Sequence, residues 1–163
     1  METVHKLEQT VASWYKGLPH LPENGRKWLA TNVWWLVLIG VILSALSVIT
    51  LLFGTLLAGA LFAGVAGAAG AAVGGLLILG VLVTLAMSVV MVVLGGMAIS
   101  PLKAMQKKGW TLLFVLFLLE VAATVASGLL SYNFLGLIWG LLWVAVGGYF
   151  LFEIHDYYKE AKK

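Results

Sequence analysis

The stretch VWWLVLIGVILSALSVITLLFGTLL, residues 33–57, decides the fold because it is long, apolar and free of charged side chains. An α-helix needs about 20 such residues to cross the ~30 Å hydrocarbon core of a bilayer. The stretch also lies inside a longer run, residues 28–102, that contains no Lys, Arg, His, Asp or Glu. Soluble domains do not bury uncharged runs of this length, so the sequence predicts an integral membrane protein.

Three further segments meet the same requirement, and they cover residues 76–99, 111–130 and 134–153. Four spans place all ten Lys and Arg residues on one side of the membrane, and the positive-inside rule assigns that side to the cytoplasm. We therefore expect an all-α protein: a four-helix transmembrane bundle, residues 33–153, with both termini cytoplasmic. We expect it in the cell membrane (plasma or inner), with residues 1–32 and the tail 154–163 in the cytoplasm.

The connection between the first two spans, AGALFAGVAGAAGAAVGG (58–75), is unusual because 14 of its 18 residues are Ala or Gly. A fifth span here would send six of the ten basic residues to the far side of the membrane, against the positive-inside rule. We therefore predict an outer connection. Three forms remain open for it: a re-entrant hairpin, an interfacial segment, or a helical extension of the second span.

Apolar residues recur at intervals of three and four near the amino terminus, which predicts an amphipathic helix; they are Val4, Leu7, Val11, Trp14 and Leu18. We expect this helix to lie on the inner leaflet, with Trp14 and Tyr15 among the headgroups. Arg26 and Lys27 follow a Pro- and Gly-containing turn, where they can meet anionic lipid. Alternatively, the apolar face of this amino-terminal helix packs as a coiled-coil seam against a second copy of the chain or against another protein.

Composition excludes several classes of function. Hydrophobic residues make up 62% of the chain and charged residues 10%, against roughly half and a quarter in soluble proteins. The chain has no cysteine, which excludes disulfides, thiol catalysis and thiolate metal sites. No HExxH, GxSxG or P-loop pattern occurs, so we expect no enzymatic activity and no cofactor. The net charge of +3 reflects topology rather than nucleic-acid binding.

A metal site has little basis in the sequence. Glu153, His155 and Asp156 lie close together after the fourth span, but helical geometry turns the histidine away from the two acids. A site would need a further ligand, such as His5 or His20, brought in by folding. The simpler interpretation is a solvated helix end, and we predict no metal.

Glu120 is the one charged residue deep inside a predicted span. It is ten residues from Trp110, an aromatic residue at the predicted cytoplasmic interface, and ten from Leu130. A charge at that depth costs ~2.5–3.5 kcal/mol on insertion scales, and chains that keep one normally pair it. The predicted spans contain no Lys, Arg or His. The carboxyl group must therefore be protonated, lie in a wet cavity, or bind a proton or cation.

Small polar residues could line a crevice that ends at Glu120, by helical spacing on three spans; they are Thr124, Ser127, Ser131, Thr84, Ser88, Ser44 and Ser47. That geometry predicts a proton- or cation-linked transporter or channel for a small ion or molecule. The alternative is a non-transporting scaffold or accessory subunit, in which Glu120 hydrogen-bonds between helices. The Gly- and Ala-rich faces also predict a homo-oligomer in the lipid bilayer.

The stretch LPHLPENGRKWLATNVWWLVLIG (18–40), after a short amphipathic helix, resembles the start of a group of small four-span membrane proteins from uncultivated, reduced-genome bacteria. That resemblance implies a four-span fold and no particular activity. Small multidrug-resistance transporters also have four spans and a lone membrane glutamate, but theirs is in the first helix of a shorter chain. They offer an analogy of mechanism.

Overall fold

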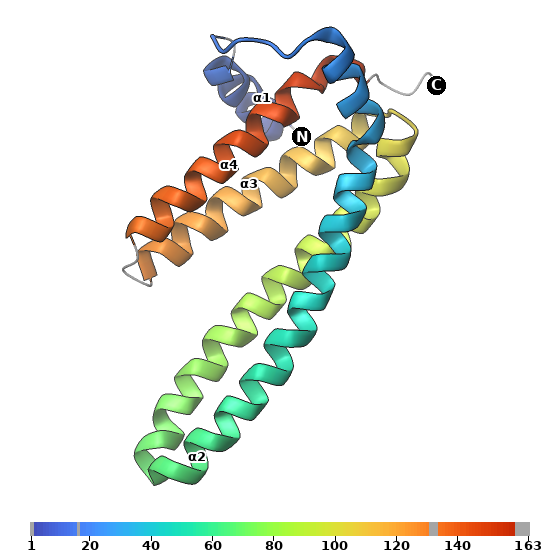
Figure 1. The fold of residues 1–163 in the computed structure, drawn as a ribbon. Coiled ribbons are helices and arrows are strands. Elements are labelled where there is room, and N and C mark those ends of the chain that lie inside the picture. Colours follow the sequence, from blue (N-terminus) through green and yellow to red (C-terminus); the bar gives the residue numbers. More distant parts are fainter. Residues whose placement is uncertain (1, 16, 131–133, 159–163) are drawn as a thin grey trace. The chain divides into compact units, whose positions relative to one another are not determined.

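The structure is a computed structural model that describes residues 2–15, 17–130 and 134–158. Its elements, in chain order, are α1 (Glu2–Tyr15), α2 (Glu23–Lys103), α3 (Lys107–Leu130), α4 (Phe134–Glu153) and the 3-10 helix η1 (His155–Tyr157) (Figure 1). These described ranges contain no strand, which confirms the predicted all-α class.

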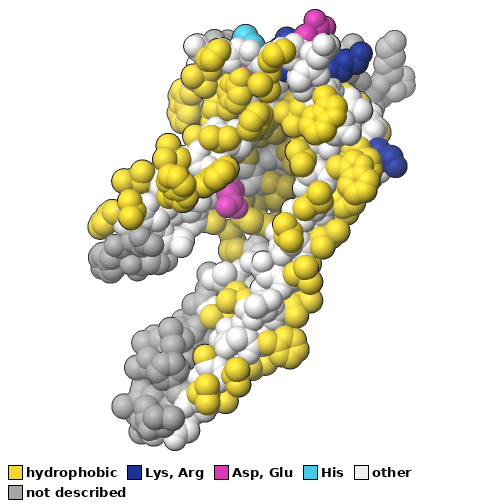
Figure 2. Space-filling model, in the orientation of Figure 1, with side chains coloured by type: hydrophobic (Ala, Val, Ile, Leu, Met, Phe, Trp, Pro, Cys, Tyr) yellow, Lys and Arg dark blue, Asp and Glu magenta, His cyan; other side chains and the backbone are white. Residues whose placement is uncertain are grey.

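Four segments of the described chain are long and apolar enough to cross a membrane: Glu23–Leu61, Thr84–Lys103, Lys107–Leu129 and Phe134–Tyr157. They overlap the four predicted spans, so the number of spans is confirmed by length and composition, and the chain is consistent with a multi-pass membrane protein. Hydrophobic side chains are spread along the helices in Figure 2. Exposed apolar helices are stable in lipid, where every backbone polar group is satisfied inside the helix.

α2 is a helical hairpin rather than one straight helix. The ribbon folds back on itself (Figure 1). Its backbone breaks at Gly67, where φ is 55° and ψ is −139°. A side chain would strain that conformation, whereas glycine adopts it readily. The two arms pair in antiparallel fashion, because a Cβ added to Gly95 would lie 2.7 Å from the Val41 side chain. The segment 58–75 is therefore helical on both sides of Gly67, and its depth relative to the membrane stays a prediction.

The chain divides into two compact units. The core unit consists of the described residues of Met1–Leu36 and Met97–Lys163, and the hairpin unit consists of Val37–Gly96. The core unit holds α1, α3, α4 and η1 together with both ends of α2. The hairpin unit holds the rest of α2.

α3 and α4 pack side by side in the core unit and run in opposite directions (Figure 1). Trp110 and Phe114 of α3 are fully buried, with their rings stacked 5.5 Å apart. The Trp110 indole N–H donates to the carbonyl of Leu151 at 2.9 Å. Trp110, expected at the cytoplasmic end of the third span, is therefore a core residue, and its depth in the membrane stays a prediction. It fills the core, because a buried Trp can satisfy its one donor there and contribute its large apolar area.

Candidate functional site

Glu120 lies near the middle of the span Lys107–Leu129, and its side chain is exposed. No residue in the described part of the chain forms a hydrogen bond or ion pair with it. Gly128, which packs against Leu137 of α4, is about 80° away around the helix, since each residue turns it by about 100°. Glu120 therefore lies beside the α3–α4 contact rather than within it.

The predicted crevice draws its lining from both units. In the core unit, Thr124 packs against Gly140 of α4, where an added Cβ would lie 2.7 Å from the Thr124 methyl group. Ser127 is exposed, and Ser131 lies outside the described residues. The hairpin unit contains the other four residues, which are Ser44, Ser47, Thr84 and Ser88. A crevice shared by the two units stays a prediction.

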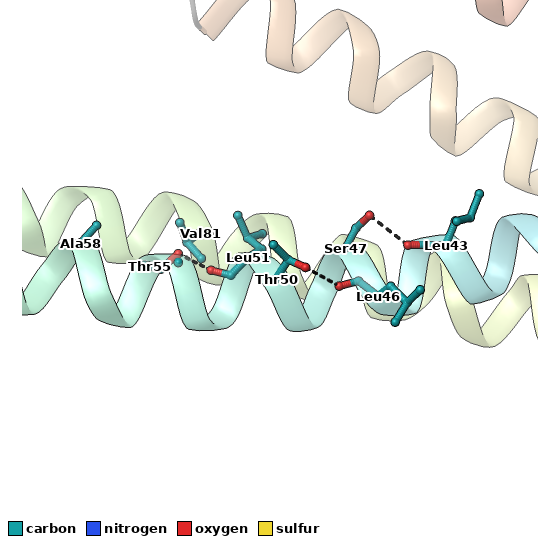
Figure 3. A pocket seen from close by; sticks show the side chains of 9 residues that line it. Leu43, Leu46, Ser47, Thr50, Leu51, Thr55, Ala58 and Val81 are labelled. Atoms are coloured by element: carbon teal, nitrogen blue, oxygen red, sulfur yellow. Dashed lines mark hydrogen bonds between the residues drawn. The ribbon is translucent and has the colours of Figure 1, made fainter.

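Ser47 lies in an open groove of about 860 Å³ on the hairpin unit (Figure 3). Thr50 and Thr55 share the groove, and the rest of its lining is apolar: Leu43, Leu46, Leu51, Gly54, Ala58 and Val81. The three hydroxyl groups donate to the carbonyl four residues earlier, at 2.9, 3.0 and 2.6 Å. Hydroxyls used in this way satisfy themselves within the helix. The groove surface therefore suits hydrocarbon better than a hydrated ion.

A group of polar contacts surrounds Glu153, at the end of α4. Its carboxylate is buried and accepts from His20 Nδ1 at 2.7 Å and from the Leu21 amide at 3.1 Å. Arg26 adds a positive charge, with its Nε 3.8 Å from the second carboxylate oxygen. That Nε is buried and has no hydrogen-bond partner among the described residues. At 3.8 Å the Arg26 charge offsets that of Glu153 without a hydrogen bond between them.

A second histidine–glutamate pair joins the opposite ends of the chain. His155 Nε2 lies 3.0 Å from the Glu8 carboxylate, and His155 Nδ1 lies 3.1 Å from the exposed Asp156. Folding does bring His20 to Glu153, as a metal site would require. However, the described residues contain no cluster of three His, Asp or Glu side chains that could hold a metal ion. In the structure, His20 contacts Glu153, and His155 contacts Glu8 and Asp156.

The four residues predicted to face lipid headgroups have different surroundings. Trp14 is 70% exposed, and Lys27 is exposed as well. Tyr15 instead stacks on Phe152 at 5.3 Å and donates to the Ala145 carbonyl at 3.2 Å. Arg26 points to Glu153. Tyr15 of α1 and Arg26 of α2 therefore contact α4.

Burial raises the pKa of two tyrosine side chains, Tyr158 and Tyr15. Tyr158, just after η1, donates to the Ala30 carbonyl at 2.8 Å, and burial raises its pKa to about 12. Burial also raises the pKa of Tyr15. In both cases the neutral phenol is favoured, because its charged form loses solvation.

Sequence reasoning missed that Tyr15 and Tyr149 bind the backbone of distant segments. Tyr149 donates to the Pro19 carbonyl at 2.6 Å. The available signal was the Gly147–Gly148 pair, because a Cβ on Gly148 would collide with the Tyr15 hydroxyl and with the Phe117 ring. Small residues on a membrane helix commonly mark such close contacts, but they do not identify the contacting residue.

Comparison of the chain with protein-family models, with curated proteins and with solved structures gives no match. Function must therefore be argued from the residues themselves.

Proposed function

We propose that the protein is a small transporter or channel that binds a proton or a cation at Glu120. One observation supports this proposal: the carboxyl group is exposed in the middle of an apolar span and has no partner among the described residues. A charge at that depth costs ~2.5–3.5 kcal/mol. Exchange of a bound proton or cation with the surroundings explains why a chain would keep such a group.

The neighbouring residues fit this role. Ser127 lies two helical turns after Glu120 on the same side of α3, and it is exposed. Its hydroxyl oxygen is an acceptor that can assist cation or water binding beside the carboxylate. In general, a protonated carboxyl group is far less costly in lipid than a carboxylate.

The substitution Glu120→Gln tests the proposal. It keeps the size and hydrogen-bonding capacity of the side chain but removes its titration. In liposomes that contain the purified protein and a pH-sensitive dye, we expect the wild-type proton or cation flux to disappear in this variant. The matched control is Asp156→Asn, which removes a carboxylate that is 88% exposed outside α4 and should leave the flux unchanged. A flux that survives Glu120→Gln would remove the mechanism.

A scaffold function is the second candidate, and the surface of α4 favours it. Trp139 and Trp143 are 64% and 65% exposed and lie one helical turn apart. They form a broad aromatic face on which a helix of a partner protein could pack. Glu120 could form a hydrogen bond across such an interface, which would stabilise it by about 0.6 kcal/mol. Chemical crosslinking in liposomes separates the two functions. A homo-oligomer that is lost with Glu120→Ala but kept with Glu120→Gln, without any flux, would favour the scaffold.

The proposed setting is the cell membrane, with both termini in the cytoplasm. The basis is the distribution of the ten Lys and Arg residues, all of which fall on one side when four spans cross.

A further inference from the structure

The amino-terminal segment contacts α4 at a position well inside the span. Tyr15 donates to the carbonyl of Ala145 and lies against Gly148. Ala145 is eight residues before Glu153, which corresponds to roughly 12 Å along the helix. The residues after α1 run along the same helix. The Pro19 carbonyl accepts a hydrogen bond from Tyr149, and the His20 ring contacts the Glu153 carboxylate.

The length of α4 leaves little room for these contacts to lie outside the membrane. α4 has 20 residues, Phe134–Glu153, which gives about 30 Å at the helical rise. The hydrocarbon core is also ~30 Å thick, so essentially the whole helix is needed to cross it. If the part after Ala145 stood outside, the remaining helix would be roughly 18 Å long and too short to span.

The amino-terminal segment is also suited to an apolar environment on one side. Tyr15 packs on Phe152 and therefore faces α4, and Val11 is buried as well. Leu7, Trp14 and Leu18 are 42%, 70% and 44% exposed, so that they form a separate apolar edge. The hydroxyls of Thr10 and Ser13 bond to helix carbonyls at 2.9 and 2.6 Å, as satisfied groups in a low-dielectric setting do.

We propose that α1 and the following turn, up to Leu21, are seated within one leaflet beside α4 rather than on the membrane surface. The occupant of the edge formed by Leu7, Trp14 and Leu18 is then the acyl-chain region of that leaflet. Val146 and Phe150 of α4 are exposed apolar residues as well. The contacts of Glu8 with His155 and of Glu153 with His20 lie at the headgroup end. This inference does not depend on any role of Glu120.

Depth measurement with a spin label tests this inference, and the absence of native cysteine removes background labelling. A nitroxide is attached to Trp14→Cys in liposomes, and its collisions with oxygen and with a water-soluble nickel chelate are compared. Lipids labelled at known depths calibrate the scale. Trp14 is mostly exposed, so its replacement removes no buried contact; Leu18→Cys provides a second position. Val146→Cys serves as the reference within the span and Lys27→Cys as the reference at the surface.

We expect the label at position 14 to report an acyl-chain depth within a few Å of the label at position 146, and roughly 10 Å deeper than the label at position 27. A depth closer to that of position 27, or access to the nickel chelate equal to that in water, would overturn the proposal. Loss of access to both reagents would also overturn it, because protein rather than lipid would then cover the edge.

Discussion

Glu153 illustrates how one carboxylate can connect the two ends of a membrane protein. It is buried at the end of α4 and accepts hydrogen bonds from His20 and from the Leu21 amide, with Arg26 nearby. Glu153→Gln replaces one acceptor oxygen by a donor that faces other donors. We expect a loss of stability of about 1–3 kcal/mol, measured as a lower unfolding midpoint in detergent micelles. Asp156→Asn removes an exposed acid and should have an effect within about 0.5 kcal/mol; equal effects would contradict this role of Glu153.

Tyr158 makes the stability of the protein depend on pH in the alkaline range. Burial raises its pKa from 10.0 to about 12, so the folded state holds the proton more tightly than the unfolded state. The stabilisation is therefore complete below about pH 10 and is lost as pH rises toward about 12. We expect the unfolding midpoint to fall over this range, and to fall less in Tyr158→Phe. Other groups titrate there as well, so an identical slope in both proteins would rule out the contribution of Tyr158.

The contact between α1 and α4 depends on the absence of a side chain at Gly148. A Cβ there would collide with the Tyr15 hydroxyl and lie 2.8 Å from the Phe117 ring, whereas nothing lies within 4 Å of a Cβ on the adjacent Gly147. We expect Gly148→Ala to cost roughly 1–3 kcal/mol by overpacking and to expose α1 to limited proteolysis. Gly147→Ala should be neutral or stabilising by up to ~1 kcal/mol, because alanine favours the helix. If both variants were equally sensitive to the protease, the contact between α1 and α4 would not depend on the missing side chain at Gly148.

The whole molecule has a predicted orientation that its basic residues determine. All ten Lys and Arg residues fall on one side when four spans cross the membrane, and translocation of positively charged loops is disfavoured. A membrane-impermeant maleimide should therefore label Gly64→Cys, in the connection between the first two spans, in intact bacterial cells. Lys108→Cys should react only after the membrane is permeabilised. Both positions are exposed in the structure, so reaction of Lys108→Cys in intact cells would reverse the topology.

Much of the candidate site lies beyond the reach of sequence analysis. Helical spacing predicts an apolar stripe on an amino-terminal helix, but it does not reveal that Tyr15 binds Ala145, 130 residues away. His20 and Glu153 are separated by 133 residues. The sequence identifies them as possible ligands, yet their pairing depends on the turn after α1. Periodicity shows that a helix has an apolar face and contains no information about the partner of that face.

The all-helical class and the four membrane-crossing segments follow from the sequence alone, because the free energy of moving a helix into lipid is close to a sum over its own residues. The uncharged residues 28–102 could therefore be assigned to membrane helices without knowing what they pack against. Folding in three dimensions decided the break at Gly67, the burial of Trp110 and the attachment of α1 to α4. These features depend on which surfaces meet, and that is a property of pairs of distant residues rather than of any single stretch.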